Sequence, residues 1–388
     1  MHYLLSDWGK TIDFFPLTLS RPLSEMRWGV LTIEAQWKQW LGDGVFYYHT
    51  LAHLHERYPH YIPQKNHVVI NASVFPTREL AQAVRQLRPG EELKARGIVL
   101  AKMVSDDSQK VERSIHFEEY PVYSLNQLTD LWSTLTEVLP ISIGYITEGR
   151  KSTSLHPSNT LIGKHPVFLE EGAAVYGAVL NTQNGPIYIG KDALVMEGAL
   201  IRGPFALGEG GVVKMGAKIY GPTVVGPFCK VGGELNNVNL HSYSNKGHDG
   251  YLGNAAIGQW CNLGANTTNS NLKNTLEEVR LYSYRTKRFE PTGLQFCGLV
   301  MGDHSKAAIG TLFNTGTVIG FSSNVFSNGF PRNFVPSFKW GGAQGLSTYQ
   351  LDKAKRTADE MMKRRGLVLD AKEEALFDYL FNEIHLWE

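Results

Sequence analysis

A chain of 388 residues is too long for one ordinary hydrophobic core, and its 43% hydrophobic content gives a globular protein enough apolar residues for two. The 38 basic residues nearly cancel the 37 acidic ones, so net charge gives no sign of nucleic acid or an anionic membrane as partner. The three cysteines lack CxxC spacing, which argues against a disulfide framework and a structural zinc site. We therefore expect buried thiols and no metal at Cys229, Cys261 and Cys297.

The chain shows no sign of export or membrane insertion. Its opening, MHYLLSDWGKTIDFF, lacks a basic segment followed by a clean apolar one. Nowhere do about 18 uncharged apolar residues run together, as a membrane-spanning helix requires. We therefore expect a cytoplasmic protein with no membrane partner.

Residues 1–150 alternate strand-like and helix-like segments. The β-branched run NHVVINASVF, residues 66–75, predicts a strand. The following PTRELAQAVRQLR places Pro76 and Thr77 at a helix start and apolar residues at helical spacing. Strand followed by helix indicates an α/β domain. The small, polar and proline-containing segment at residues 147–160 is typical of a domain junction.

Residues 151–345 have a different pattern, in which aliphatic residues recur at every sixth position. A period of six fits a β-helix in which each hexapeptide forms a short strand and a turn, with three hexapeptides per coil and the aliphatic side chain pointing inward. We expect these side chains to form a continuous apolar column. Eight consecutive positions follow this register: Ile189, Val195, Ile201, Leu207, Val213, Ile219, Val225 and Val231.

The register is interrupted twice. It is lost after Val231 and resumes at Ile257, and we expect the chain between them, which contains SNKGHDGYLGN at residues 244–254, to protrude or kink. A second, longer excursion runs from about Asn266 to Leu299. Insertions in a solenoid leave its coils intact and often carry function. Two interruptions on either side of one coil therefore predict a site there.

The residues around the first interruption resemble a known enzyme family. The stretch NKGHDGYLGNAAIGQWCNLGANTTNSN, residues 245–271, contains at residues 247–267 the form G-H-x-x-Y-L-G-[DN]-A-x-I-G-x-x-x-N-[IL]-G-A-x-T. This motif resembles the acetyltransferase part of the bifunctional N-acetylglucosamine-1-phosphate uridyltransferase/glucosamine-1-phosphate acetyltransferase. The resemblance implies a left-handed parallel β-helix, acetyl-CoA as co-substrate, and a homotrimer.

The resemblance also assigns roles to residues. His248 matches the family's general base, a task suited to imidazole because its ordinary pKa lies near neutrality. Glu234 matches the carboxylate that orients this base. Ala265 matches a residue whose backbone N–H faces the thioester oxygen, and Gly264 and Gly310 are expected beside the cofactor.

Further positions are expected to bind the acceptor sugar: Tyr251, Asn262 and Asn271 match family residues, and Lys246, Arg202 and Lys218 are the nearby cations. For the histidine and the asparagines a structural interpretation stays open, because such residues also occupy tight turns.

The sequence departs from the family at the acceptor phosphate. Where the family has a phosphate-binding lysine, this chain has Asn236, and the family's arginine position falls near Lys218 or Tyr220. Lys214 and Lys230 lie on the same coils as replacements. The acceptor is therefore expected to be an amino-sugar phosphate or a nucleotide sugar.

The N-terminal half departs further, although the chain as a whole is similar to an alternative bacterial form of the bifunctional enzyme. The family's glycine-rich GxGT loop, which cradles nucleotide phosphates, is absent, and Arg21 and Arg27 stand nearby as candidate nucleotide-binding residues. Asn71 occupies the place of the magnesium-binding aspartate, and a neutral amide is a weaker ligand for Mg²⁺. Nucleotidyl transfer with Mg²⁺ and binding of a nucleotide sugar without catalysis both stay open.

Residues 346–388 predict two amphipathic helices with Gly366 between them, and we expect them to pack against the end of the β-helix, which they would cap, or against a neighbouring subunit. No chemistry is expected there. Three functions follow for the whole chain: acetyl transfer in the β-helix, sugar-1-phosphate nucleotidyl transfer as the main activity, or a non-catalytic trimer that binds a nucleotide sugar.

Overall fold

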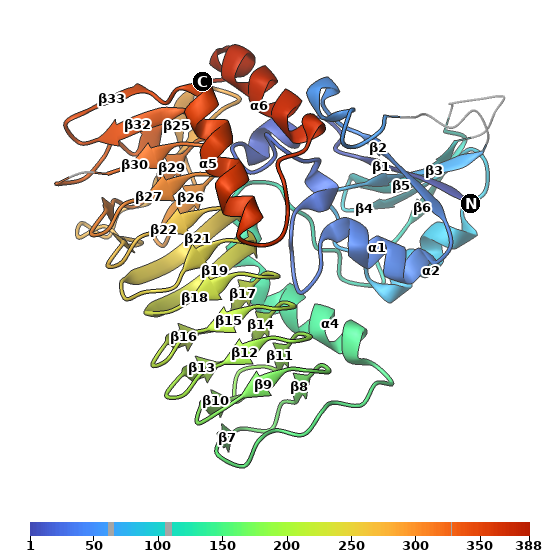
Figure 1. The fold of residues 1–388 in the computed structure, drawn as a ribbon. Helices are drawn as coiled ribbons and strands as arrows, with labels where there is room; N and C mark the ends of the chain where they lie inside the picture. The colour runs from blue at the N-terminus through green and yellow to red at the C-terminus, as the bar shows by residue number, and fades with distance from the viewer. Residues whose placement is uncertain (61–65, 105–110, 327) are drawn as a thin grey trace.

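The computed structural model describes residues 1–60, 66–104, 111–326 and 328–388. Its N-terminal part contains a six-stranded mixed sheet with the order β2-β1-β3-β5-β4-β6 (Figure 1). The strands are β1 (His2–Ser6), β2 (Val45–His49), β3 (His67–Asn71), β4 (Glu91–Ala95), β5 (Ile98–Val104) and β6 (Arg113–His116). The helices are α1 (Ile33–Leu41), α2 (Arg78–Gln86), α3 (Asp130–Ser133) and α4 (Leu135–Thr147), with short 3₁₀ turns at Thr11–Phe14, Leu23–Glu25 and Ala52–Leu54.

The predicted strand and helix at residues 66–88 are confirmed as β3 and α2. All five residues of β3 are buried, as their β-branched character predicts for a strand inside a sheet. The side chain of Thr77 accepts a hydrogen bond from the backbone N–H of Leu80 at 3.2 Å and so caps the start of α2.

The chain beyond residue 150 forms a parallel β-solenoid with three faces that matches a left-handed β-helix. The first face contains β7 (Thr160–Ile162), β10 (Val179–Asn181), β13 (Leu200–Arg202), β16 (Lys218–Tyr220), the starts of β19 (Glu234–Ser242) and β21 (Tyr251–Gln259), then β23 (Thr268–Asn269) and β28 (Leu312–Phe313). The second face contains β8 (Val167–Leu169), β11 (Ile187–Ile189), β14 (Phe205–Leu207), β17 (Thr223–Val225), the ends of β19 and β21, β26 (Leu299–Met301), β29 (Thr317–Ile319) and β31 (Phe334–Val335). The third face contains β9 (Ala174–Val175), β12 (Leu194–Val195), β15 (Val212–Val213), β18 (Lys230–Val231), β20 (Asn245–Lys246), β22 (Asn262–Leu263), β27 (Lys306–Ala307), β30 (Asn324–Val325) and β32 (Lys339–Gly342).

The period-six register is confirmed. All eight aliphatic residues from Ile189 to Val231 are buried in one apolar core inside the solenoid. The side chain of each residue points into the solenoid, and the strand register stacks residues of successive coils, as in Ile189, Leu207 and Val225. The column of side chains is therefore continuous along the solenoid axis.

The expected protrusion between Val231 and Ile257 is wrong. The strand register pairs Val231 with Lys246 and Leu235 with Leu252, so the coils continue but contain fewer residues than three full hexapeptides. In these coils β19 and β21, nine residues each, run from the first face onto the second without a break. The period is lost because the coils are shortened, and not because residues are inserted.

The second excursion is a true insertion. After β23 the chain leaves the solenoid, forms an antiparallel hairpin of β24 (Arg280–Ser283) and β25 (Arg288–Pro291), and returns at β26. The hairpin reaches the N-terminal domain, where the Arg285 guanidinium donates to Gly9 O at 2.7 Å and pairs with Asp13.

The N-terminal domain packs against the second face of the solenoid. Outward side chains of that face, such as Tyr188, Ala206 and Val224, belong to the same apolar core as the N-terminal sheet and helices. Helix α4 contacts β14, and α3 contacts β19 and β21 (Figure 1). The two halves therefore share one core and are not joined by a flexible linker.

The two predicted C-terminal helices are confirmed as α5 (Leu351–Lys363) and α6 (Ala371–Glu383), followed by a 3₁₀ turn at Ile384–Leu386. They run along the side of the solenoid and do not cap its end; there, β33 (Gly345–Thr348) folds back on β32 (Figure 1). Glu373 of α6 pairs with Arg57 of the N-terminal domain at 2.9 Å and lies 3.5 Å from His304 of the solenoid. Over the described residues, no helix is long and apolar enough to cross a bilayer.

Candidate functional site

A cavity of about 770 Å³ lies between the third face of the solenoid and α5. Solenoid residues form the floor and one wall of the cavity, and helix α5 forms its roof. Its lining includes His248, Asn262, Gly264 and Ala265, four of the residues that the sequence resemblance singled out.

The floor of the cavity is a row of polar side chains. The strands that form the floor, β18, β20, β22 and β27, are two residues long, with the second residue directed into the solenoid core and the first directed outward. The strand register places the outward residues of neighbouring coils beside one another. In order along the axis the floor residues are Lys230, Asn245, Asn262 and Lys306.

The roof comes from one face of the C-terminal helix. Thr357, Glu360, Met361 and Arg364 are spaced at three- and four-residue intervals, which brings them onto one side of an α-helix. Arg365, just beyond the helix, fixes the roof to the floor, since its guanidinium donates to Phe228 O at 3.1 Å and to Asn245 Oδ1 at 3.3 Å. The expectation that the tail carries no functional groups therefore does not hold for the cavity lining.

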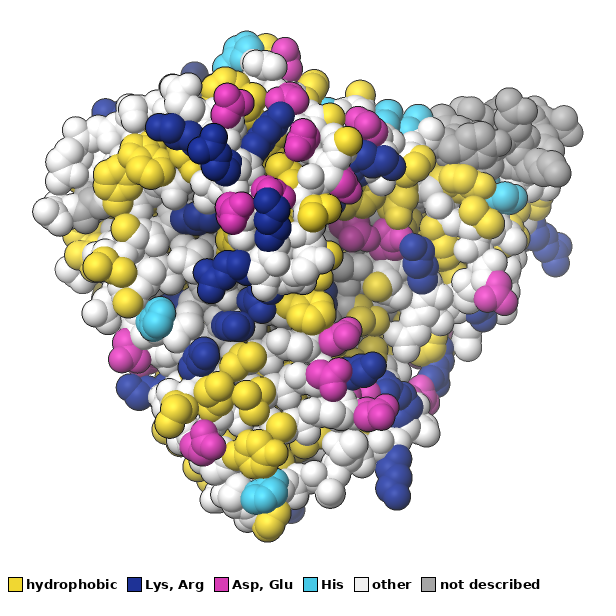
Figure 2. Space-filling view, in the orientation of Figure 1, with side chains coloured by type: hydrophobic (Ala, Val, Ile, Leu, Met, Phe, Trp, Pro, Cys, Tyr) yellow, Lys and Arg dark blue, Asp and Glu magenta, His cyan; other side chains and the backbone are white. Residues whose placement is uncertain are grey.

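The cavity is strongly cationic. Lys214, Lys230, Lys306, Arg364 and Arg365 line it, and the only carboxylate among the lining residues is that of Glu360. Figure 2 shows Lys and Arg side chains gathered over the middle of the solenoid, below α5. Burial lowers the pKa of Lys306 to about 8. Such a site fits a ligand that carries several negative charges, because their binding relieves the repulsion between these cations.

His248 lies at the corner between the third and first faces, in the segment Gly247–Gly250 between β20 and β21. Neighbouring coils place exposed side chains at the same corner position, Met215 with 70% of its surface accessible and Ile309 with 78%. His248 is likewise exposed and makes no side-chain hydrogen bond within the described part of the chain.

The surroundings of His248 are unusually open. Most coils have four residues at this corner, as in 214–217 and 264–267, but the coil below His248 has only Gly232 and Gly233. On the other side, the corresponding residue is the small Ala265. A Cβ on Gly233 would lie 2.8 Å from His248 O, so no side chain can stand beneath this corner without moving it. A ligand can therefore approach the imidazole from either side.

Ala265 presents an unused hydrogen-bond donor. Its backbone N–H has no acceptor among the described residues, whereas its carbonyl accepts from Gly310 N at 2.7 Å. Gly264 beside it is required by close packing, because a Cβ there would lie 2.6 Å from the backbone nitrogen of Ile309. The cavity thus contains an unpaired imidazole and has an unpaired amide beside it, on consecutive coils.

A second group of predicted residues meets on the first face. Asn271 Nδ2 donates to Tyr251 OH at 2.9 Å and to Asn254 Oδ1 at 2.7 Å. Burial raises the pKa of the Tyr251 phenol, and Coulomb repulsion from Glu234 acts in the same direction. Glu234 is the strand neighbour of Tyr251, and no hydrogen bond or ion pair joins it to His248 in the described structure. The expected pairing of base and carboxylate is therefore not formed here.

The three predicted cations occupy two different places. Arg202 and Lys218 are exposed on the first face, on the two coils before Glu234. Lys246 lies inside the solenoid with 1% of its surface accessible, and its ammonium group donates only to backbone carbonyls. None of these three residues is among the described residues that line the cavity. The cations of the cavity are other lysine and arginine residues.

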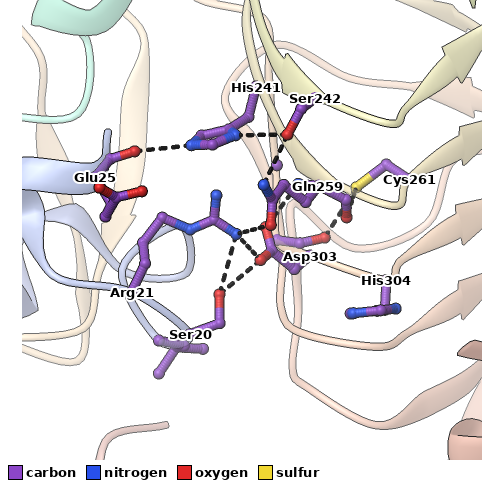
Figure 3. A network of polar contacts seen from close by, with 12 residues as sticks. Ser20, Arg21, Glu25, His241, Ser242, Gln259, Cys261, Asp303 and His304 are labelled. Carbon is purple, nitrogen blue, oxygen red and sulfur yellow. Dashed lines mark hydrogen bonds and ion pairs between the residues drawn. The ribbon is translucent and has the colours of Figure 1, made fainter. Parts of the chain in front are cut away.

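Arg21 and Arg27 are buried in the interface between the two halves. Arg21 pairs with Asp303 and donates to Gln259 Oε1 at 3.1 Å, while Ser20 donates to Asp303 at 2.6 Å (Figure 3). Arg27 donates to His241 O at 2.8 Å, and burial lowers its pKa to about 10. Both guanidinium groups are thus held by protein acceptors of the solenoid and the adjoining loop.

The side-chain amide of Asn71, at the end of β3, is also hydrogen-bonded to protein groups. Its Nδ2 donates to Val99 O at 3.0 Å, and its Oδ1 accepts from both the backbone and the hydroxyl of Ser73. Lys10 lies nearby and donates to Ser73 Oγ and to Leu125 O. In the described ranges, no three His, Cys, Asp or Glu side chains are grouped to hold a metal ion. The structure does not bring Asn71 together with Arg21 and Arg27.

A family model matches one part of the chain. Residues 3–151 match the model of a family described as sugar nucleotidyl transferase, which covers the N-terminal part of the chain. No curated protein matches the chain.

Solved structures of low similarity align with it. The polySia-specific acetyltransferase NeuO is 11% identical over 54% of this chain and 100% of its own, with a TM-score of 0.31. Arabidopsis UDP-N-acetylglucosamine acyltransferase is 13% identical over 60% and 91%, with a TM-score of 0.23. A hexapeptide transferase family protein from Anaplasma phagocytophilum is 16% identical over 59% and 94%, with a TM-score of 0.20.

Proposed function

We propose that this protein is a sugar-nucleotide biosynthesis enzyme that transfers an acetyl group from acetyl-CoA to the amine of an amino-sugar phosphate or a nucleotide sugar. The observation that carries the proposal is the unpaired imidazole of His248 at the edge of a cavity lined by five cationic side chains. The acetyltransferase motif of residues 247–267 supports the same chemistry.

The reaction follows from the two unpaired groups. His248 accepts a proton from the sugar amine as its nitrogen attacks the thioester carbonyl, which forms the C–N bond. The N–H of Ala265 donates to the oxygen that becomes negative in the tetrahedral intermediate. When the intermediate collapses, the C–S bond breaks, and the proton held by His248 passes to the sulfur to give CoA as the free thiol.

The cavity suits the acyl donor. The phosphate groups of acetyl-CoA carry several negative charges, and they pair with the cations of the floor and roof. Asn262, in the middle of the floor, provides an amide for the polar part of the donor. Gly264, where a Cβ would lie 2.6 Å from Ile309 N, keeps its corner narrow, and the pantetheine arm reaches the Ala265 amide past Gly264 and Gly310.

The acceptor sugar binds on the first face, around the corner from the cavity. Tyr251 and Asn271 supply hydroxyl and amide groups to the sugar, and Lys218 and Arg202 supply positive charge to its phosphate. The same face exposes apolar side chains along several coils, namely Leu161, Leu200, Tyr220 and Leu312. A second and third copy of the chain cover them, so the enzyme works as a homotrimer in the cytoplasm.

The test is a transfer assay with acetyl-CoA and a panel of amino-sugar phosphates and nucleotide-linked amino sugars, which measures release of the free thiol. We expect His248→Gln to lower kcat by about 10²–10⁴-fold, the usual contribution of a general base. Binding of acetyl-CoA measured by calorimetry should be retained in this variant. Thiol release by His248→Gln at the wild-type rate would refute the assignment.

A second candidate function is supported by the family match of residues 3–151. In this alternative the N-terminal domain joins a nucleoside triphosphate and a sugar 1-phosphate in a Mg²⁺-dependent reaction, at the carboxyl ends of β1 and β3. Magnesium-dependent release of pyrophosphate, unaffected by His248→Gln, would favour it. If the protein binds a nucleotide sugar but releases neither the free thiol nor pyrophosphate, the third function remains, namely a non-catalytic trimer that binds a nucleotide sugar.

A further inference from the structure

Lys246 occupies a position where every neighbouring coil has an apolar residue. The strand register stacks Val213, Val231, Lys246, Leu263 and Ala307 along the inside of the third face. A cation in this column is costly, because burial removes its hydration. Val231 and Leu263 show that an aliphatic side chain fits the column on either side. The lysine is therefore retained for something other than packing.

Its ammonium group is directed at one corner. Nζ donates to His248 O at 2.6 Å, to Asp249 O at 3.3 Å and to Gly232 O at 3.4 Å. The ammonium group thus lies between the corner that contains His248 and the shortened corner at Gly232, and it is hydrogen-bonded to both. Burial lowers the pKa of Lys246 to about 8, an effect that the nearby carboxylate of Asp249 opposes.

The hydrogen bond from Lys246 to the carbonyl of His248 affects the direction in which the His248 side chain points. The direction of Cβ relative to the carbonyl depends on the backbone torsion ψ, so hydrogen bonds that hold the carbonyls of His248 and Asp249 toward the core limit ψ and thereby the direction in which the His248 side chain leaves the backbone. The corner 247–250 begins and ends with glycine and would otherwise sample many conformations. His248 itself has no side-chain hydrogen bond to orient it. The lysine is the internal support that the predicted carboxylate partner does not provide.

We infer that Lys246 is a positioning residue, which holds the His248 corner from inside the solenoid and so sets the orientation of the imidazole at the edge of the cavity. The sequence predicts Lys246 to bind the sugar as a nearby cation; its burial instead assigns it to the base. The inference rests on the proposed function only where it names His248 as the base.

The test compares Lys246→Met, which keeps the length of the side chain and removes its donors, with Ile257→Met, a matched change in the solenoid core away from this corner. For Lys246→Met we expect kcat to fall at least tenfold, KM for acetyl-CoA to change less than twofold, and the melting temperature to stay equal or rise. Ile257→Met should leave kcat and KM unchanged.

A second readout does not depend on activity. In wild-type protein the ring signals of His248 in a histidine-labelled NMR spectrum, assigned with His248→Gln, should be single and sharp, and in Lys246→Met they should broaden or split. Identical His248 signals in the two proteins, or an unchanged kcat, overturn the inference. If wild-type protein transfers no acetyl group, the proposed function fails while the NMR comparison still decides the role of Lys246. Lys246→Leu, which restores the aliphatic column, replaces the methionine variant if that one does not fold; failure of both to fold also overturns the inference.

Discussion

The third face of the solenoid and the N-terminal domain both contain the residue types that a transferase uses, yet these residues have different surroundings. On the solenoid, His248 and the floor lysines line a cavity, and the His248 side chain and the amide of Ala265 have no partner among the described residues. At the N-terminal domain, Arg21, Arg27 and Asn71 are all hydrogen-bonded to protein groups.

The contrast shows that residue type alone does not identify a site, because the same residue types can be held by protein acceptors. A buried arginine must find acceptors within the protein, because an unpaired charge away from water is very unfavourable. Arg27 and the Nη2 atom of Arg21 have such acceptors, whereas Arg21 Nε has none among the described residues. Three experiments test whether the two regions differ in this way.

The largest expected effect is on stability. Arg21→Ala leaves the Asp303 carboxylate buried without its cation, since both side chains are only 3% accessible. We expect the free energy of unfolding to fall by about 3–5 kcal/mol, the usual result of breaking a buried pair from one side. Urea denaturation measures it, with the exposed Arg202→Ala as control at under about 0.5 kcal/mol.

In a double-mutant cycle, Asp303→Asn should restore part of the loss. A variant of Arg21 that folds with wild-type stability but no longer binds a nucleotide would show the opposite, namely that the N-terminal arginine serves a ligand.

A somewhat smaller effect concerns pH. Asp7, buried after β1, accepts hydrogen bonds from Thr11, Thr50 and the backbone of Leu23, and burial raises its pKa to about 6. Because this folded-state pKa lies above the usual value near 4, the folded protein holds a proton that the unfolded chain releases. The stability that comes from this proton is present below about pH 4 and is lost as the pH rises through 6.

The stability of the wild type relative to Asp7→Asn should therefore fall by about 3 kcal/mol between pH 4 and pH 7. Thermal unfolding of both proteins across this range measures the difference. A constant difference would contradict the raised pKa of Asp7. A difference that changes when magnesium and a nucleoside triphosphate are added would make Asp7 a ligand group and would weaken the contrast between the two regions.

The smallest expected effect is on binding at the solenoid. Removing Lys230 and Arg364 together should weaken acetyl-CoA binding by about 10–100-fold, which corresponds to about 1.4–2.7 kcal/mol. Calorimetry at low and high salt measures it, and the loss should shrink at high salt because screened charges contribute less. Lys191→Ala, on a corner outside the cavity lining, is the control. Equal losses for the control and the double variant would mean that the cavity cations do not bind the donor.

Much of the fold could be predicted because it is local. The aliphatic residues from Ile189 to Val231 are separated by one fixed period, and that period alone determines which side chains face inward. The Thr77 cap of α2 and the two C-terminal helices are equally local. The motif around His248 likewise led to residues that line one cavity.

The rest depends on where distant segments meet. The shortened corner at Gly232 shifts the register, so Lys246 turns inward although the sequence places it beside His248. The roof residues have helical spacing, which predicts their helix. It does not predict that this helix packs over the third face of the solenoid. Arg21 finds Asp303 nearly three hundred positions later in the chain. Such contacts are set by tertiary packing, which no local pattern contains.

The packing of the N-terminal domain on the second face also restricts how the protein can evolve. Tyr188, Ala206 and Val224 face outward from the solenoid into a core that the other half supplies, and Glu373 of α6 is held by Arg57. A gene that lost residues 1–150 would encode a solenoid with a bare apolar side and an unanchored roof helix. The fusion of the two halves is thus hard to reverse: even if selection no longer required chemistry in the first half, it would still preserve that half as the wall of the second.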